Sequence, residues 1–441
     1  MSICEVQLSN FKSFYKASTV LNKFNVVVGA NASGKSNFVH FFKFIKDLRA
    51  FGLDDAISMQ GGAEYLFNAS HQSDNILSGK IVNDTKQGFL PRQEMGIGFE
   101  ILKNSYEIDI EANDKRTYVK SISDKLINDC RFFKYEKLEE RGFGYKELEP
   151  LGEGQIGIFN ADGVMSLYVN APKGIDKATL IDNSMELMVF ESFLTGRDAQ
   201  LGKTQSLLES TIPPWAIIGY EIVETIHGTA VFDIDPKLTK QAQPVTGRHD
   251  LESDGSNLAT VIRRLSKNYI TKRQMENIIK DLLPFVEGVS IKKLADNVII
   301  RVREKFKSRN LFPAFLLSDG TLSLTALSVV LFFENNPLKI IEEPERNIHP
   351  HLISKIVTLM REASEESQII TTTHNPEIVK HANIDELVLV SRDHLGDSNL
   401  SRPGEEKDIK DFLRNKLGIE ELYIQNILEK YHSKERSKEN V

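Results

Sequence analysis

The sequence predicts an α/β protein built around a mostly parallel sheet, and three observations support this class. Apolar strand-like segments alternate with helical segments in the last third of the chain. A glycine-containing loop joins a short strand to a helix near the N-terminus. Residues 96–122 alternate polar and apolar side chains, which indicates an antiparallel β meander beside the parallel core.

Composition limits the classes of function that need to be considered. The chain has 441 residues, enough for two to three domains or for one domain with a large insertion. Its formal net charge of −7 excludes a histone-like role, so any contact with nucleic acid needs a local basic patch. Two cysteines, Cys4 and Cys130, are too few for a disulfide framework or a four-thiolate zinc site, and they favour a reducing cytoplasm. We expect neither a secretion signal nor a membrane-spanning segment.

Four regions are expected along the chain. Residues 1–122 form an N-terminal lobe with the glycine-containing loop and the β meander. Residues 123–250 form an inserted, α-rich subdomain with a helix near residues 184–194. Residues 251–400 form a C-terminal lobe, and residues 401–441 form a charged tail.

The elements of the core follow from hydrophobic periodicity. A β-branched strand at residues 26–28 precedes a helix at residues 37–49, in which phenylalanines recur at helical spacing. The C-terminal lobe is expected to contain a long apolar helix at 318–333, strands at 338–341, 368–371 and 386–390, and a helix at 352–363.

The loop between the first strand and its helix carries a phosphate-binding pattern. Residues 29–36, GANASGKS, match G-x-x-x-x-G-K-S in full. Its glycines allow backbone N–H groups to surround phosphate oxygens, Lys35 would neutralise the β and γ phosphates, and Ser36 would bind Mg²⁺. The pattern predicts a site for ATP and Mg²⁺. The residues assigned to the nucleotide are Gly29, Asn31, Ser33, Gly34, Lys35, Ser36 and Asn37.

Two adjacent carboxylates follow the strand at residues 338–341. Parallel sheets bind ligands at the carboxyl ends of their strands, so this position favours a role at the nucleotide. Because side chains alternate along a strand, Glu342 would face the metal while Glu343 orients a water for attack on the γ-phosphate. The competing interpretation is a solvated acidic loop.

Two further segments lie where a phosphate could bind. Ser318, Asp319 and Gly320 lie at the start of the long apolar helix, where an ordinary N-cap is the simplest explanation. A helix start of this kind can also bind a γ-phosphate supplied by another molecule. His374 follows the strand at residues 368–371 and would sense the γ-phosphate, although a lone histidine is more often structural.

Taken in order, GANASGKS, LSDGT, IIEEPE and TTTHNPE resemble the four nucleotide motifs of ABC-type ATPases. The opening segment is similar to the RecF and SMC-like branch and to the ATPase half of OLD nucleases. This resemblance implies an ABC/SMC-like ATPase head with an antiparallel β subdomain and an inserted α-rich subdomain. It also implies head-to-head dimers in which Ser318, Asp319 and Gly320 of one copy contact ATP held by Lys35 and Ser36 of the other. Two departures are that Asp319 replaces a glycine of transporters and that Glu342 replaces the aspartate of many relatives.

The resemblance leaves two functions open. The first is the ATPase subunit of an antiphage defence system, which forms dimers or larger oligomers and controls a separate effector, a nuclease or a toxin. The alternative is a RecF-like DNA-binding repair ATPase. Candidate basic residues for DNA are Arg263, Arg264, Lys267, Lys292, Lys293, Arg301, Arg303, Lys305, Lys307 and Arg309.

Two other functions are disfavoured. Only 67 residues follow His374, too few for an added nuclease domain. His349 and His351 are two positions apart and do not share a helix face, so they do not suggest a metal centre. A transporter subunit would lack an insertion of the size expected here.

Overall fold

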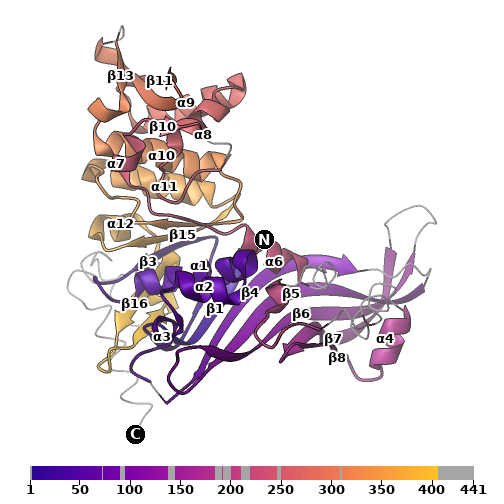
Figure 1. The fold of residues 1–441 in the computed structure, drawn as a ribbon. Helices are drawn as coiled ribbons and strands as arrows, with labels where there is room; N and C mark the ends of the chain where they lie inside the picture. The colour runs from indigo at the N-terminus through magenta and orange to yellow at the C-terminus, as the bar shows by residue number, and fades with distance from the viewer. Residues whose placement is uncertain are drawn as a thin grey trace, which may run out of the picture. The chain divides into compact units, whose positions relative to one another are not determined.

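The computed structural model describes residues 2–71, 73–89, 95–137, 145–183, 191, 200–209, 219–245, 250–307 and 310–405. The chain forms two compact units (Figure 1). The first contains Met1–Asn22, Asn37–Gly228 and Arg392–Leu400, and the second contains Lys23–Ser36, Thr229–Ser391 and Ser401–Val441.

The first unit is built on a seven-stranded antiparallel sheet with the order β2-β1-β4-β5-β6-β7-β8. Its long strands dominate this unit in Figure 1. The strands are β1 (Ser2–Phe11), β2 (Phe14–Val20), β4 (Ile76–Phe89), β5 (Met95–Ala112), β6 (Val119–Lys137), β7 (Tyr145–Ala161) and β8 (Val164–Asn170). The short strand β17 (Ser398–Ser401) begins beside this unit's Ser13, whose carbonyl accepts a 2.7 Å hydrogen bond from the N–H of Ser398.

Helix α1 (Lys35–Phe51) packs buried phenylalanines, among them Phe41 and Phe44, against this sheet. Phe41 meets Phe11 of β1 edge to face at 5.5 Å between ring centroids. At Gly79 of β4 an added Cβ would lie 2.6 Å from the Phe41 ring, so the glycine makes room for the helix. Other helices in the described part of the unit are α2 (Leu53–Met59), α3 (Ala63–Leu66), α4 (Lys177–Asn183) and α6 (Tyr220–His227).

The β meander is longer than the sequence pattern predicts. The expected boundary at residue 122 falls inside β6, and β7 and β8 continue the same sheet to Asn170. The region expected to be inserted, residues 123–250, therefore begins with β structure. The helix expected near residues 184–194 falls almost entirely outside the described residues, as does the expected tail after residue 405.

The second unit contains the parallel strands that the sequence predicts. They are adjacent in the order β16-β3-β15-β14-β9 and are almost wholly buried, as expected for a sheet covered on both faces. Their bounds are β3 (Phe24–Val28), β9 (Ala230–Phe232), β14 (Leu338–Glu342), β15 (Gln368–Thr373) and β16 (Leu387–Arg392). No sequence pattern predicted β9, which places residues 230–232 in the parallel sheet instead of in the inserted region.

Helices and a small antiparallel sheet complete this unit (Figure 1). The helix α10 is buried over Thr321–Leu331, which explains why its sequence is apolar on every side. The helices are α7 (Pro236–Thr239), α8 (Leu258–Leu265), α9 (Tyr269–Leu282), α10 (Asp319–Phe333), α11 (Ile353–Ala363) and α12 (Pro376–His381). The small sheet consists of β10 (Gln243–Pro244), β11 (Val286–Leu294), β12 (Asn297–Glu304) and β13 (Leu311–Pro313). Within the described ranges, no helix has the length and apolar character needed to cross a membrane.

Candidate functional site

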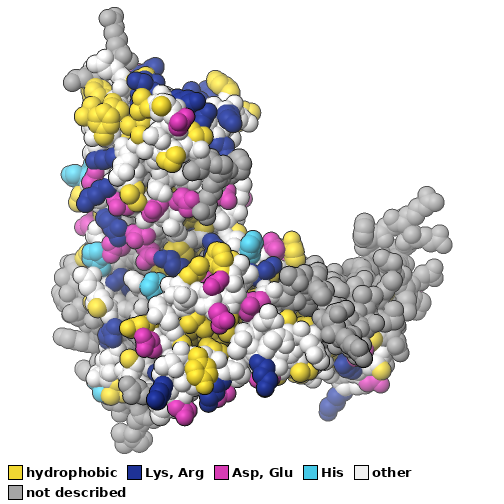
Figure 2. Space-filling model, viewed as in Figure 1, with side chains coloured by type: hydrophobic (Ala, Val, Ile, Leu, Met, Phe, Trp, Pro, Cys, Tyr) yellow, Lys and Arg dark blue, Asp and Glu magenta, His cyan; other side chains and the backbone are white. Residues whose placement is uncertain are grey.

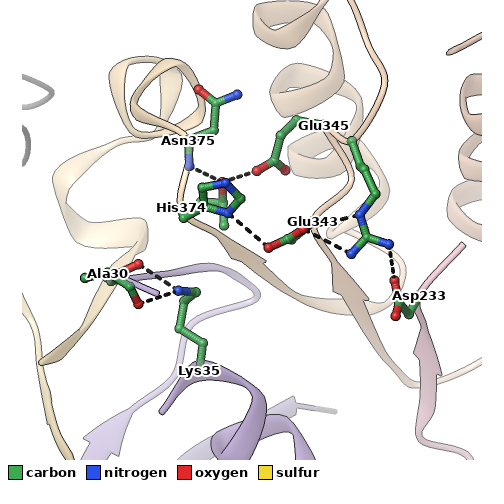
Figure 3. A network of polar contacts seen from close by, with 10 residues as sticks. Ala30, Lys35, Asp233, Glu343, Glu345, His374 and Asn375 are labelled. Atoms are coloured by element: carbon green, nitrogen blue, oxygen red, sulfur yellow. Dashed lines mark hydrogen bonds and ion pairs between the residues drawn. The ribbon is translucent and has the colours of Figure 1, made fainter. Parts of the chain in front are cut away.

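Strand register brings three predicted site residues to one edge of the parallel sheet. Val28 at the end of β3 pairs with Thr373 at the end of β15, and Thr372 pairs with Glu342 at the end of β14. The loops that carry Lys35, His374 and Glu343 therefore leave the sheet at the same level, and Figure 3 shows their side chains in one view. This carboxyl edge is where open parallel sheets bind ligands.

The loop after β3 has the backbone of a phosphate cradle. Gly34 has a φ of 117°, a conformation that L side chains rarely adopt. An added Cβ at Gly29 would lie 2.2 Å from the carbonyl oxygen of Val390, so only glycine fits there. The Nζ of Lys35 donates to the carbonyl oxygens of Gly29 and Ala30 at 2.7 and 2.9 Å (Figure 3). A buried cation beside a curled loop at the start of α1 is a donor set that suits phosphate.

The other residues assigned to the nucleotide and metal lie in this loop, at the start of α1 and at the end of β14. Ser36 is exposed in the first turn of α1, and Glu342 is half-buried as the last residue of β14. One hydroxyl and one carboxylate suit Mg²⁺, which is commonly held by one or two protein groups together with phosphate oxygens and water. Asn31 is exposed and Ser33 is buried, while the Asn37 amide donates to the Ser13 hydroxyl at 2.8 Å.

The carboxylate of Glu343 is held from two sides. Its backbone has a φ of 44°, and its N–H donates to the carbonyl of Thr372 at 2.9 Å. The Nδ1 of His374 lies 3.0 Å from Oε1, and the Nη2 of Arg346 donates to Oε2 at 3.0 Å. The Nη1 of Arg346 donates in turn to Asp233 at 2.9 Å (Figure 3). A left-handed backbone at a non-glycine residue costs free energy, and such conformations cluster at functional sites.

This arrangement keeps Glu343 ionised beside an open space. Partial burial disfavours its charged form, but the hydrogen bonds and charge of Arg346 and the proximity of His374 hold its pKa below the usual value. The space is a pocket of about 410 Å³ lined by Glu343, Glu345, Arg346, His374, Asn375 and Pro376. An ionised carboxylate facing a pocket can accept a hydrogen bond from a water molecule.

Glu345 is a second carboxylate of the pocket that the sequence analysis did not single out. The Thr373 hydroxyl donates to the Glu345 carboxylate. The Oγ1 of Thr373 also accepts a hydrogen bond from the N–H of Asn375 at 2.9 Å. Burial raises the pKa of Glu345, although the hydrogen bond from Thr373 opposes the rise. These contacts fix the backbone on both sides of His374. The only signal in the sequence was the repeated glutamate of EEPE.

Arg346 and Asp233 were also missed. The charge pair Glu343 and Arg346, three residues apart, was visible in the sequence as a possible local contact. Asp233 gave no signal, because it lies 113 residues from its partner and follows a strand of three residues.

The start of α10 has the geometry of an N-cap. The Ser318 hydroxyl accepts a hydrogen bond from the N–H of Thr321 at 3.2 Å, which confirms the capping role. Asp319 forms an ion pair with Lys240 within the same unit. An added Cβ at Gly320 would lie 2.6 Å from the carbonyl oxygen of Asn347, so the glycine allows a close backbone approach. Ser318 is exposed, so its hydroxyl can also reach a ligand brought by another molecule.

Some of the candidate basic residues share one face of the small sheet. Side chains that pair across two strands point to the same face, and Lys292 of β11 pairs with Ile299 of β12. Arg301 and Arg303 follow Ile299 by two and four positions along β12, so they share this face with Lys292. Lys293 pairs with Val298 and points to the other face. Figure 2 shows Lys and Arg side chains gathered over the end of the second unit that carries β11 and α9. The side chains of residues 307 and 309 lie outside the described part of the chain.

A family model matches residues 24–146 and 220–380, more than half of the chain. Its description is "AAA domain, putative AbiEii toxin, Type IV TA system". The matched segments include the phosphate loop, the start of α10, Glu343 and His374. No curated protein matches the chain in sequence.

Solved structures with a similar chain path include several heads of SMC proteins. The SMC head domain from Thermotoga maritima is 14% identical, with a TM-score of 0.38 over 91% of this chain and 99% of that chain. The Smc head domain with a coiled coil and joint from Pyrococcus yayanosii is 11% identical, with a TM-score of 0.43 over 94% and 99%. An Smc head domain from Pyrococcus furiosus, bound to the C-terminal domain of ScpA, is 15% identical, with a TM-score of 0.39 over 93% and 99%. Likeness at this level carries no conclusion about activity or partners.

Proposed function

The chain belongs to the family of AAA domains whose model it matches, and on this premise we propose that it binds and hydrolyses ATP with Mg²⁺. The observation that supports the proposal best is the register of β3, β15 and β14, which brings Lys35, His374 and Glu343 to one sheet edge. Phosphoryl transfer depends on charge that stabilises the phosphates and on an oriented nucleophile, and these side chains can supply both.

Each predicted site residue has a proposed role. Lys35 and the N–H groups of its loop bind the β and γ phosphates. Ser36 and Glu342 would hold Mg²⁺, which supplies charge neutralisation at the phosphate oxygens. Glu343 accepts a hydrogen bond from the attacking water and orients it. His374, within hydrogen-bond distance of Glu343, contacts the γ-phosphate.

The proposed active form is a dimer of identical heads. Ser318, Asp319 and Gly320 of one copy would contact ATP bound at Lys35 of the other, with two nucleotides between the heads. The exposed Ser318 at the start of a 15-residue helix supports this role, because the first turn of a helix favours anions. Asp319 adds a like charge near the phosphate, and its ion pair with Lys240 offsets part of that charge.

Light scattering of a slowly hydrolysing variant tests the dimer. With ATP and Mg²⁺, Glu343→Gln is expected to elute with the mass of a dimer, and without nucleotide with that of a monomer. Adding Ser318→Arg should abolish the dimer while ATP binding persists, since Lys35 and its loop are unchanged. A dimer of the double variant, or a monomer of Glu343→Gln at saturating ATP, contradicts this mode of association.

We further propose that ATP turnover controls a separate effector, a nuclease or a toxin, in an antiphage defence system. The description of the matching family, which names a toxin and a toxin–antitoxin system, supports this direction. The free cysteines Cys4 and Cys130 suit a protein of the reducing cytoplasm. Co-expression with the product of the neighbouring gene, followed by pull-down with and without ATP, tests the proposal. Capture that does not depend on ATP, or no capture at all, argues against control by turnover.

The second candidate is a DNA-binding repair ATPase, and the basic face of β11 and β12 favours it. Lys292, Arg301 and Arg303 would contact phosphates, so duplex binding should weaken steeply with salt. Titrating a labelled duplex at low and moderate salt tests this function. The double variant Arg301→Glu with Arg303→Glu should lose duplex binding. If it binds the duplex as well as the wild type does, this face is not the DNA-binding surface.

A further inference from the structure

We infer that Arg346, held by Asp233, is a positioning residue that fixes the carboxylate of Glu343 for its role in ATP hydrolysis. This inference rests on the proposed function. It assigns a role to two residues that none of the motifs contains.

Glu343 follows β14, and the residues that follow the two neighbouring strands hold its carboxylate from either side. On one side, β15 ends at Thr373 and is followed by His374, whose Nδ1 lies 3.0 Å from Oε1. On the other side, β9 ends at Phe232, which pairs with Ile341, and the next residue is Asp233. Asp233 reaches Glu343 through Arg346. The carboxylate is thus held between the ends of two buried strands, one through each oxygen.

The guanidinium of Arg346 uses different nitrogens for its two partners. Its Nε and Nη2 donate to Oε2 of Glu343 at 3.3 and 3.0 Å, and its Nη1 donates to Oδ1 of Asp233 at 2.9 Å. A planar group fixed at both ends holds one orientation, which a lysine ammonium cannot reproduce. The N–H of Arg346 also donates to the carbonyl of Glu343 at 3.0 Å, so a tight turn sets the separation of the two side chains.

Asp233 is itself well placed to anchor the arginine. Its N–H donates to the carbonyl of Ser253 at 2.8 Å, which fixes its backbone just after β9. About half of the Asp233 side chain and a similar share of the Arg346 side chain are exposed, so the ion pair is not there to neutralise a buried charge. Arg346 contacts Glu343 and lines the pocket, and Asp233 holds Arg346, so both residues act on the orientation of the Glu343 carboxylate.

The test measures kcat and KM for ATP together with the melting temperature. Arg346→Ala should lower kcat by about 10- to 100-fold, because small misplacements of a catalytic group have effects of this size. The KM for ATP should change less than about threefold, because Arg346 has no assigned contact with the nucleotide. Arg346→Lys should remain low in kcat although it keeps the charge. Arg273→Ala, an exposed arginine of α9, is the control and should match the wild type.

Asp233 provides the second arm of the test. Asp233→Ala should lower kcat, whereas Asp233→Asn, which retains an acceptor oxygen for Nη1, should recover most of it. Because Asp233 acts through Arg346, the double variant Asp233→Ala with Arg346→Ala should be no slower than Arg346→Ala alone. Additive losses, full activity of Arg346→Lys, or faster turnover in Arg346→Ala would each overturn the inference. An inactive wild-type chain overturns the proposed function as well, whereas an active wild type with unaffected variants overturns this inference alone.

Discussion

The two units each contain an acidic centre with a shifted pKa, and the two centres differ in what surrounds the carboxylate. Asp124 of β6, in the first unit, is almost fully buried. Glu343, in the second unit, lines an open pocket of about 410 Å³. The comparison separates a carboxylate that stabilises a fold from one that is available to a ligand.

Asp124 accepts hydrogen bonds from four donors of its own unit. The hydroxyls of Tyr106 and Ser206 donate to it at 2.9 and 2.5 Å, the Asn160 amide at 2.8 Å and the N–H of Leu207 at 2.8 Å. Burial raises the pKa of Asp124 from 3.8 to about 6, although these hydrogen bonds lower it. The contacts tie residues 206–207 to the sheet, so the group has a structural purpose.

Glu343 has fewer partners and an unusual backbone. Its pKa moves in the opposite direction, because Arg346 and His374 outweigh the cost of partial burial. A shifted pKa is therefore not enough to identify a functional site in this chain. The difference lies in the open pocket, in the φ of 44°, and in the position at the carboxyl edge of parallel strands.

The largest expected effect is the loss of nucleotide binding in Lys35→Ala. Removing the cation should raise the Kd for ATP by about 100-fold, since a hydrogen bond to a charged group is worth about 1.5–3 kcal/mol and Lys35 would meet two phosphates. Titration with a fluorescent ATP analogue measures this change. The melting temperature should remain within about 2 °C of the wild type, because the Nζ donates to the carbonyl oxygens of Gly29 and Ala30 in its own loop, which serve the phosphate cradle more than the core. A variant that binds ATP normally would contradict the role of Lys35 at the nucleotide. A variant that unfolds would show that Lys35, like Asp124, stabilises the fold.

Asp124→Ala should have the opposite profile. Four donors lose their acceptor, so we expect the free energy of unfolding to fall by about 3 kcal/mol. Urea denaturation followed by circular dichroism measures the loss. The kcat per folded molecule should match that of the wild type. A large drop in kcat with unchanged stability would place Asp124 among functional groups.

Thr373→Val should lower both stability and kcat moderately, because the Thr373 hydroxyl links the pocket to the sheet. Glu345 loses its donor and the N–H of Asn375 loses its acceptor. We expect a stability loss of about 1–3 kcal/mol and a severalfold lower kcat through displacement of His374. Thr373→Ser, which retains the hydroxyl, is the matched control. Equal behaviour of the two variants in kcat and stability would show that the hydroxyl is not needed.

The last expected effect is a pH dependence of stability that arises from Asp124. The unfolded carboxyl loses its proton near pH 3.8 and the folded one near pH 6. Between these values the folded state binds more protons, so the contribution of Asp124 to stability falls as the pH rises through this window. Thermal unfolding at pH 4.5, 5.5 and 6.5 measures the slope for the wild type and for Asp124→Asn, which cannot titrate. The difference between the two should change in this window, and a constant difference would contradict the raised pKa.

The sequence predicted the parts of the second unit whose signals are local. The strands that become β14 and β15, the helices α10 and α11 and the phosphate loop each fit a pattern within a few residues, and the structure confirms these elements. Parallel strands end at one edge, so proximity of the loops that carry Lys35, Glu343 and His374 followed from fold class. The roles of these residues remain predictions.

The parts that the sequence did not predict depend on distant pairing. Three residues, Ala230–Phe232, carry no readable period, so neither β9 nor Asp233 could be placed. The extent of the antiparallel sheet was also missed, because β7 contains a run of charged and glycine residues that hides its alternation. Pairing with β6 and β8 decides that segment.

The most direct test of the proposed ATPase site is a single-turnover measurement on the wild type and Glu343→Gln. Each protein, in excess over radiolabelled ATP with Mg²⁺, is quenched at intervals, and bound ATP and released phosphate are quantified. We expect the wild type to convert its bound ATP and Glu343→Gln to retain intact ATP, with a rate lower by about 100- to 10,000-fold. Equal rates of phosphate release, or no bound ATP in either protein, would contradict the assignment of this sheet edge as the site of hydrolysis.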